Sequence, residues 1–296
     1  MKPFFGATTD NLIKANLLAL GVPWDVSSSY RRGSAEAPDK IRQATSGNLY
    51  NPYTETYVDI LDKWQMFDAG NVMLSEHVIN ARTDVFKTLK PLYNQKKDFK
   101  FLFLGGDHLI TYFCIHSLVK LGLFQDGTIG ILYFDAHPDL YEHYEGNRYS
   151  HACVLRRVIE ETPIDPKNIF QVGIRAGTTE QREFSNNHGI TTITSNEFLK
   201  RGVEETAVLI QEFSQKVDHI YLSIDLDILD PAFAPGLGNP EPAGVSTRKL
   251  VDLIQELTDL PIVAFDLVEL CPAFDKSNIS AFAAAKVIKE TLGVLG

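Results

Sequence analysis

Short apolar runs alternate along this chain with longer segments in which apolar residues recur every three or four positions. Four of the short runs end directly in acidic or imidazole side chains, and they cover residues 99–104, 129–134, 219–224 and 261–265. Such runs, rich in aromatic and branched residues, are typical of strands buried on both faces of a parallel sheet. Sites in open α/β sheets form beyond the carboxyl ends of the strands, so we expect these polar residues to cluster there.

Further strand and helix signals alternate from one end of the chain to the other. The strand signals lie at 17–22 and 169–174, and the helix signals lie at 76–92, 247–257 and 279–295. No repeat, low-complexity tract or linker interrupts this alternation. The pattern predicts a layered α/β fold that forms a single domain over residues 1–296.

Two segments outside these elements carry signals of their own. Residues 33–42 combine a turn with a helix start, in which Ser34 can cap the helix and Pro38 fits the first turn. Residues 231–244 form a loop rich in proline and glycine that follows one of the four apolar runs. Its length and position predict an ordered loop that lines a site, with a mobile linker as the alternative.

Composition narrows the class of partners. The chain has 296 residues and a formal net charge of −10, which disfavours nucleic acids and anionic membranes because both require a basic face. No stretch approaches the ~18 uninterrupted apolar residues of a membrane helix, and the first ten residues lack the apolar core of a signal peptide. Three cysteines, an odd number without close spacing, favour a reducing compartment. We therefore expect a cytoplasmic protein.

The polar residues after the apolar runs are of the types that bind metal ions. They are His108 after a double glycine, Asp135, His137 and Asp139 at alternate positions, and Asp225 and Asp227 at alternate positions. On an extended chain, alternate residues lie on the same side. Four carboxylates and two imidazoles exceed the needs of one tetrahedral zinc ion, and they suit two divalent ions, Mn²⁺ in preference to Zn²⁺. A pair of ions about 3.5–4 Å apart can hold a nucleophilic hydroxide at neutral pH.

Three motifs resemble a known family when they are taken together and in order. GGDH at 105–108, DAHPD at 135–139 and SIDLDILDP at 223–231 resemble the ureohydrolases, which include arginase, agmatinase and formiminoglutamase. The similarity extends over nearly the whole chain, from GVPWD at 21–25 to ELCP at 269–272. The resemblance implies a three-layer α/β/α sandwich around a mostly parallel eight-stranded sheet, with two Mn²⁺ ions at its edge.

The resemblance also implies roles for single residues. One ion would bind His108, Asp135, Asp139 and Asp225, and the other would bind Asp135, His137, Asp225 and Asp227. His151 matches a catalytic histidine that shuttles protons, and Glu269 matches the carboxylate that pairs with the substrate guanidinium. The alternatives are a buried structural histidine and a surface carboxylate. The implied reaction hydrolyses a guanidinium C–N bond and releases urea and an amine.

The substrate is indicated more weakly, because it depends on loops. Ala176 stands where arginases have an aspartate that helps to bind the α-amino group, and residues 140–150 lack their hydroxyl-rich run for the α-carboxylate. Glu142 and Glu145 suit a second cationic group, although solvated surface charges are equally compatible with the sequence. The resemblance therefore favours agmatine, hydrolysed to putrescine and urea in polyamine biosynthesis. Guanidinobutyrate, guanidine, a carboxylated agmatine derivative and arginine are the alternatives. Departures from the agmatinase pattern are Asn71, Asn239 and Ala243.

Two other classes of protein fit the motifs less well. A dinuclear metallophosphoesterase would carry its Asp-x-His element first and close with a Gly-His-x-His pair, whereas the order here is reversed. A non-catalytic metal-binding protein would be favoured by the loss of a ligand or of His151 or Glu269, and none is lost. Members of the resembling family are usually trimers or hexamers, so we expect a homo-oligomer that acts on a small cationic guanidino compound.

Overall fold

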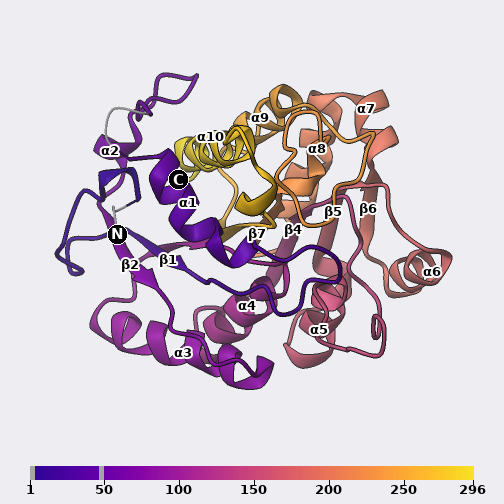
Figure 1. The fold of residues 1–296 in the computed structure, drawn as a ribbon, viewed down its shortest axis with the longest axis horizontal. Coiled ribbons are helices and arrows are strands. Elements are labelled where there is room, and N and C mark those ends of the chain that lie inside the picture. Colours follow the sequence, from indigo (N-terminus) through magenta and orange to yellow (C-terminus); the bar gives the residue numbers. More distant parts are fainter. Residues whose placement is uncertain (1–3, 47–49) are drawn as a thin grey trace.

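The computed structural model describes residues 4–46 and 50–296, so residues 1–3 of the N-terminal segment discussed above lie outside it. Eight strands form one sheet in the order β2-β1-β3-β8-β7-β4-β5-β6, and every neighbouring pair is parallel. The strands are β1 (Leu17–Gly21), β2 (Met66–Asn71), β3 (Lys100–Leu104), β4 (Ile129–Phe134), β5 (Ile169–Ile174), β6 (Thr191–Thr194), β7 (His219–Asp225) and β8 (Ile262–Val268). Helices cover both faces of the sheet, which confirms the predicted α/β/α sandwich (Figure 1).

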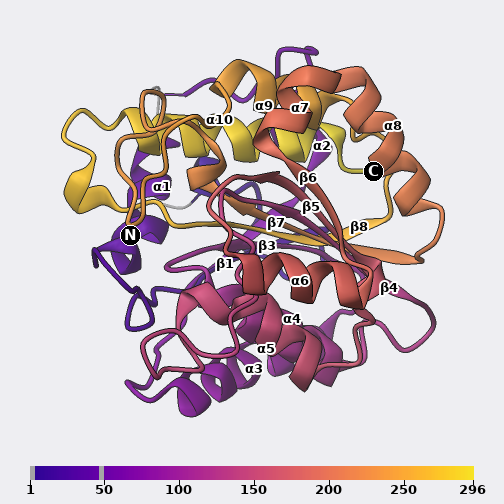
Figure 2. The ribbon, with the colours of Figure 1, turned by 90° about the vertical axis from the view of Figure 1, so that its right-hand side faces the viewer.

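Each face of the sheet has its own hydrophobic core. Alternate side chains of a strand point to opposite faces, and accordingly Leu17 and Ala19 of β1 belong to one core while Leu18 and Leu20 belong to the other. The first core lies under α1 (Ala37–Ala44), α2 (Ile60–Lys63), α7 (Ser195–Arg201), α8 (Val203–Ser214), α9 (Thr247–Gln255) and α10 (Ile279–Val294). The second core lies between the other face of the sheet and α3 (Val78–Gln95), α4 (Leu109–Leu121) and α5 (Val154–Glu161). Helix α6 (Thr179–His188) lies beside the edge strand β6 (Figure 2). No helix of the described residues is long and apolar enough to cross a membrane.

The four apolar runs with polar ends become four neighbouring strands at the centre of the sheet. They are β3, β8, β7 and β4, which lie in that order. Their carboxyl ends therefore meet at one edge, as the sequence pattern predicted. Strand β8 is longer than the predicted run at 261–265, because it continues to Val268 and includes the buried carboxylate of Asp266.

The segment before α1 differs from the prediction. A single 3-10 turn, Ser34–Glu36, precedes the helix, so the residue at the helix N-cap is Glu36, and no side chain caps it. The prediction that Ser34 caps the helix was wrong, because the chain makes this tighter turn before the α-helical hydrogen bonds begin. Pro38 lies in the first turn of α1, as expected.

The loop at 231–244 is ordered by contacts with the segment that follows β8. The Gly236 N–H donates to Ser280 Oγ at 2.7 Å, and the Gly236 carbonyl accepts from the Cys271 N–H at 2.8 Å. A Cβ atom at Gly236 would lie 2.4 Å from that of Asp275, so the close approach requires glycine. These contacts confirm the ordered loop and exclude the mobile linker.

Candidate metal centre and active site

The six residues predicted as metal ligands come together beyond the ends of β3, β4 and β7. We call these six side chains the carboxylate cluster, and its members are His108, Asp135, His137, Asp139, Asp225 and Asp227. One half is built around His108, which precedes α4. Its Nδ1 lies 2.9 Å from Asp225 Oδ2, 3.0 Å from Asp135 Oδ2 and 3.5 Å from Asp139 Oδ2. All four of these side chains are buried.

The other half is built around His137, whose Nδ1 lies 2.8 Å from Asp227 Oδ2 and 3.5 Å from Asp135 Oδ1. Asp135 thus belongs to both halves, each of which gathers ligand atoms closely enough to hold one cation. Both oxygens of this shared carboxylate are engaged, because Oδ2 faces His108 Nδ1 and Oδ1 faces His137 Nδ1. An oxygen-rich donor set with a shared, fully buried carboxylate fits two adjacent divalent ions.

Local backbone turns, not an extended chain, bring the alternate residues together. Asp135 Oδ1 accepts from the His137 N–H at 2.6 Å, and Asp225 Oδ1 accepts from the Asp227 N–H at 2.7 Å. Aspartates commonly form such turns with the backbone two residues further on. Asp139 then adopts a left-handed conformation, with φ of 52°. The alternate residues therefore do not converge on an extended chain, as predicted, because the chain bends after each strand.

The carboxylate cluster contains more negative charge than its own residues can balance. Burial and repulsion from neighbouring carboxylates raise the pKa of Asp225, and they raise the pKa of Asp139 to about 7. Burial also acts to raise the pKa of Asp135, but hydrogen bonds from the two histidines lower it overall. Two imidazoles face four buried carboxylates, and divalent cations are the groups that would neutralise the excess.

A buried polar chain below the cluster orients the ring of His108. Ser223 Oγ donates to Asp266 Oδ1 at 2.8 Å and lies 2.9 Å from His108 Nε2. Because the single hydroxyl proton of Ser223 is used on Asp266, the serine accepts from His108 Nε2–H, which leaves Nδ1 free to bind a cation. Thr111 and Tyr221 also donate to Asp266. The sequence analysis missed Ser223 and Asp266, although both interrupt strands that are otherwise almost entirely apolar.

His151 and Glu269 form a buried pair beside the cluster. His151 Nδ1 lies 2.7 Å from Glu269 Oε1, which also accepts from the backbone N–H of His108 at 2.8 Å. Burial lowers the pKa of His151, but attraction to Glu269 and the hydrogen bond with it are stronger, and the pKa rises to about 9. Glu269 adopts a left-handed conformation with φ of 65°, a strained state for a residue with a side chain. The structure therefore brings both predicted catalytic residues to the metal-ligand set.

A cavity of about 200 Å³ opens in front of this pair and the cluster. Tyr141, Tyr144 and Ala176 line it, and its described lining includes neither lysine nor arginine. The two tyrosine rings lie 5.3 Å apart between centroids, at an angle of 59°. Glu142 and Glu145 are exposed and are not among the lining residues, so the solvated alternative applies to them.

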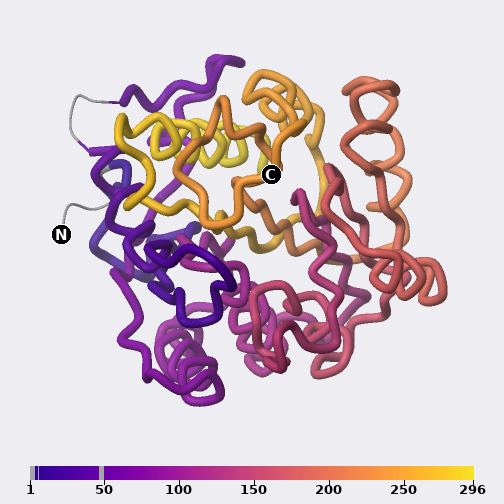
Figure 3. The backbone as a smooth tube through the Cα atoms, turned by 45° about the vertical axis from the view of Figure 1, so that its right-hand side comes forward, coloured from indigo at the N-terminus to yellow at the C-terminus, as the bar shows by residue number. Residues whose placement is uncertain are grey.

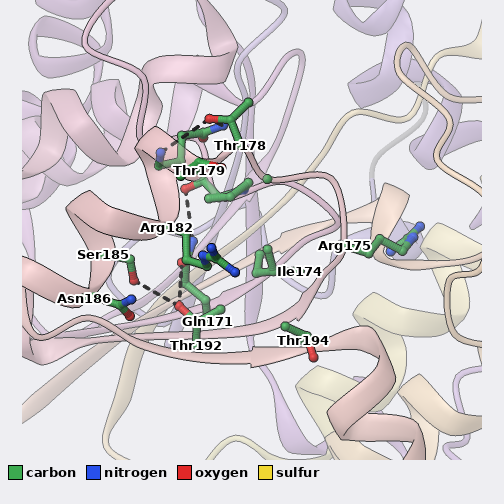
Figure 4. Close-up of a pocket in the computed structure, with 13 residues that line it drawn as sticks. Gln171, Ile174, Arg175, Thr178, Thr179, Arg182, Ser185, Asn186, Thr192 and Thr194 are labelled. Carbon is green, nitrogen blue, oxygen red and sulfur yellow. Dashed lines mark hydrogen bonds between the residues drawn. The ribbon is translucent and has the colours of Figure 1, made fainter.

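A second cavity, of about 280 Å³, lies between α6 and the ends of β5 and β6 (Figure 4). The two cavities share Gln181, but the larger one contains none of the predicted ligands or catalytic residues. Its polar side chains bond to one another, as Thr192 does with Gln171 and Ser185. The guanidinium of Arg175 is bound by loop carbonyls, including that of Glu241 at 2.7 Å. The smaller cavity is therefore the candidate active site.

The chain therefore has a three-layer α/β/α fold with a cluster of candidate metal ligands at the carboxyl edge of a parallel sheet. A model of the arginase family matches residues 15–293. The chain belongs to the arginase family of ureohydrolases and is an amidinohydrolase of that family, which confirms the resemblance inferred from the three motifs.

Relatives with different names are similar to this chain to nearly the same degree. Proclavaminate amidinohydrolase of Streptomyces clavuligerus is 33% identical over 94% of this chain and 87% of its own length. Its solved structure has a TM-score of 0.86 and 30% identity, with 99% of this chain and 96% of that chain covered. Mitochondrial arginase 1 of Oryza sativa subsp. indica is 34% identical over 94% of this chain and 81% of its own length. Agmatinase of Halalkalibacterium halodurans is 32% identical over 97% of this chain and 95% of its own length. The substrate therefore has to be argued from the site.

Proposed function

We propose that this protein hydrolyses the guanidinium group of agmatine to putrescine and urea. The observation that carries the proposal is the state of Glu269 next to the carboxylate cluster. Its Oε1 is engaged by His151 and by the His108 backbone, whereas its Oε2 is buried and receives no hydrogen bond from the described residues. A buried carboxylate oxygen requires donors, and a planar guanidinium supplies them in a fork that matches a carboxylate.

Two Mn²⁺ ions are the proposed cofactor, because the donor set is rich in oxygen and shares a carboxylate. One ion would be held by His108, Asp135, Asp139 and Asp225, and the other by Asp135, His137, Asp225 and Asp227. When bound, such a pair supplies Lewis-acid activation of water at neutral pH. His151 lies in the same cavity, with its pKa above neutrality, so it can carry a proton to the departing amine.

The lining of the cavity favours agmatine among the guanidino compounds. A ligand with a carboxylate at its far end, such as arginine or guanidinobutyrate, would meet no lysine or arginine among the described lining residues. Tyr141 and Tyr144 line the cavity and suit a distal ammonium, because aromatic rings attract cations. The net charge of −10 also attracts a cationic substrate at longer range. Free guanidine would leave this outer part of the cavity without a role.

Urea release measured with the Mn²⁺-loaded protein tests the proposal across agmatine, arginine, guanidinobutyrate and guanidine. Agmatine should have the highest kcat/KM. The variant Glu269→Gln should keep both ions, by elemental analysis, and lose turnover of every compound in the panel. Dominant turnover of arginine would contradict the choice of agmatine, and the absence of urea from all four compounds would contradict the choice among these guanidino substrates.

We also propose that the protein is a cytoplasmic homo-oligomer of three or six chains, each a single ureohydrolase domain. The basis is membership of the arginase family together with three free, buried cysteines. Light scattering of the purified protein tests the oligomeric state, and a monomer at micromolar concentration would contradict it.

A further inference from the structure

We propose that the amide oxygen of Asn239 is a second acceptor for the substrate guanidinium, which makes Asn239 a specificity-determining residue of this site. The inference rests on the proposed function, because it assumes that a guanidinium occupies the cavity. Asn239 lies in the loop at 231–244, beside the loop that follows β1 (Figure 3), and it lines the cavity together with Glu269 and His151. It is also one of the positions at which this chain departs from the agmatinase pattern.

The hydrogen bonds around Ser29 determine which way the Asn239 amide faces. Ser29 Oγ lies 2.8 Å from His151 Nε2. The same oxygen accepts from Asn239 Nδ2 at 3.1 Å. The other end of the amide, Oδ1, is consequently the end that Ser29 does not bind.

The same region leaves two acceptors without donors. The Glu269 carboxylate can only accept, so His151 Nδ1–H donates to its Oε1 at 2.7 Å. Glu269 Oε2 and Asn239 Oδ1 are both buried, and neither accepts a hydrogen bond from the described residues. A Cβ atom at Gly238 would lie 3.2 Å from Glu269 Oε2, so the backbone next to Asn239 passes close to that oxygen. Two unsatisfied acceptors thus belong to residues that line the same cavity.

A guanidinium is a ligand that matches two such acceptors. It carries N–H donors on every nitrogen, in one plane, and accepts no hydrogen bond. A carboxylate oxygen and a neutral amide oxygen can therefore receive different N–H groups of the same cation. An ammonium has its donors at a single point and fits this arrangement less well. The second acceptor should thus select for guanidinium over a simple amine.

Three variants of the Mn²⁺-loaded protein test the role of the amide oxygen with agmatine as the probe. Asn239→Leu removes both polar ends at similar volume, and Asn239→Asp keeps an oxygen acceptor while it removes the donor to Ser29. Asn187→Leu makes the same change at an exposed site on α6 and is the control. KM for agmatine should rise about tenfold or more in Asn239→Leu, the usual cost of a lost hydrogen bond to a charged group. Asn239→Asp should retain a much lower KM than Asn239→Leu, and the control should match the parent protein.

The outcomes separate this inference from the proposed function. Metal content and melting temperature of each variant are measured first, so that a folding defect is recognised. An unchanged KM in a folded Asn239→Leu that still releases urea would overturn the role of Asn239 and leave the function standing. The same holds if Asn239→Asp loses agmatine as completely as Asn239→Leu does, because the oxygen would then not be the group that matters. If the parent protein releases no urea from any guanidino compound, the proposed function fails instead.

Discussion

Two groups of buried charges in this protein differ in whether they are complete. In the first, Arg42 of α1 binds both oxygens of Asp68 on β2 at 2.8 Å, and a further guanidinium nitrogen bonds to Asn71. We call these three residues the Arg42 cluster. The backbone N–H groups of Phe4 and Gly70 complete the hydrogen bonds of Asp68. The carboxylate cluster at the centre of the sheet has no such partner, because two imidazoles face four carboxylates.

The comparison shows how a structural ion pair can be told from a site that awaits a ligand. Although burial acts to raise the pKa of Asp68, Arg42 lowers it below its ordinary value, so this carboxylate is stable as an anion. Burial and repulsion raise the pKa of Asp225 and of Asp227 instead. Both groups lie at parallel strands and hold side chains with little exposure to solvent, but only the second needs charge from outside the chain. Four predictions test this difference, and the changes we expect to be greatest come first.

The largest effect is expected when Asp225 of the carboxylate cluster, which we propose is shared by the two ions, is neutralised. Asp225→Asn should lower kcat/KM for urea release by more than about a hundredfold, the upper range for groups that only support a metal ligand. Metal content should fall as well. The metal-free variant should be no less stable than the metal-free parent protein, since a disfavoured negative charge has been removed. Retained activity with both ions bound would contradict the assignment of Asp225 to the metal pair.

The opposite response is expected in the Arg42 cluster. Arg42→Met should lower the free energy of unfolding by about 3–5 kcal/mol, because it leaves Asp68 buried without its partner. The activity of each folded molecule should stay unchanged. The double variant Arg42→Met/Asp68→Asn is the control and should recover part of the loss. Denaturant unfolding checks this prediction, and a change of less than about 1 kcal/mol, as found for exposed pairs, would contradict it.

The two clusters should also respond oppositely to pH. In the metal-free protein, Asp139 has a pKa of about 7, above its ordinary value, so the folded state holds a proton that the unfolded state loses. The free energy of unfolding should therefore fall as pH rises from about 4 to 7. The lowered pKa of Asp68 instead stabilises the folded state. This contribution is lost only when the pH falls below the ordinary pKa of an aspartate. Both pH dependences are tested by measuring the free energy of unfolding at several pH values, with and without Mn²⁺.

Two controls sharpen the pH experiment. Asp139→Asn removes the titrating group and should flatten the dependence of the metal-free protein between pH 4 and 7. Saturating Mn²⁺ should reverse or flatten it in the parent protein, because the ions hold these carboxylates unprotonated. A metal-free parent protein that becomes more stable as pH rises through this range would show that the carboxylate cluster is not short of positive charge.

The smallest effect is expected from adding a carboxylate to the cluster that is already complete. In Asn71→Asp the new charge gains attraction to Arg42, but it loses the hydrogen bond from Asn71 Nδ2 to Asp39 at 3.0 Å. Because Asp39 is exposed, these contributions should nearly cancel, with a change within about 1 kcal/mol. Thermal unfolding measures the change, and a large loss of stability would show that the Arg42 cluster was not balanced. Elemental analysis should detect no additional bound Mn²⁺.

The amino-acid pattern alone predicted the strands and the chemistry at their ends. Uninterrupted apolar runs have to be buried on both faces, and carboxylates or imidazoles directly after them have to lie at the edge of the sheet. The residue types of the six predicted ligands, of His151 and of Glu269 were therefore informative before their positions were known. The pattern did not predict how these residues converge, because the turns after Asp135 and Asp225 depend on hydrogen bonds from the backbone to these side chains.

The residues that complete these sites from distant parts of the chain became known only from the fold. Ser29 meets His151 from 122 positions away, and Asn239 meets Ser29 from 210 positions away. Likewise, Arg42 lies on a helix and Asp68 on an edge strand, and no local sequence pattern predicts that they form a pair. A serine or an asparagine in a loop has many possible partners, and the order of strands in the sheet selects among them. Local periodicity records which side chains must be buried, whereas hydrogen-bond partners depend on how the buried layers are joined.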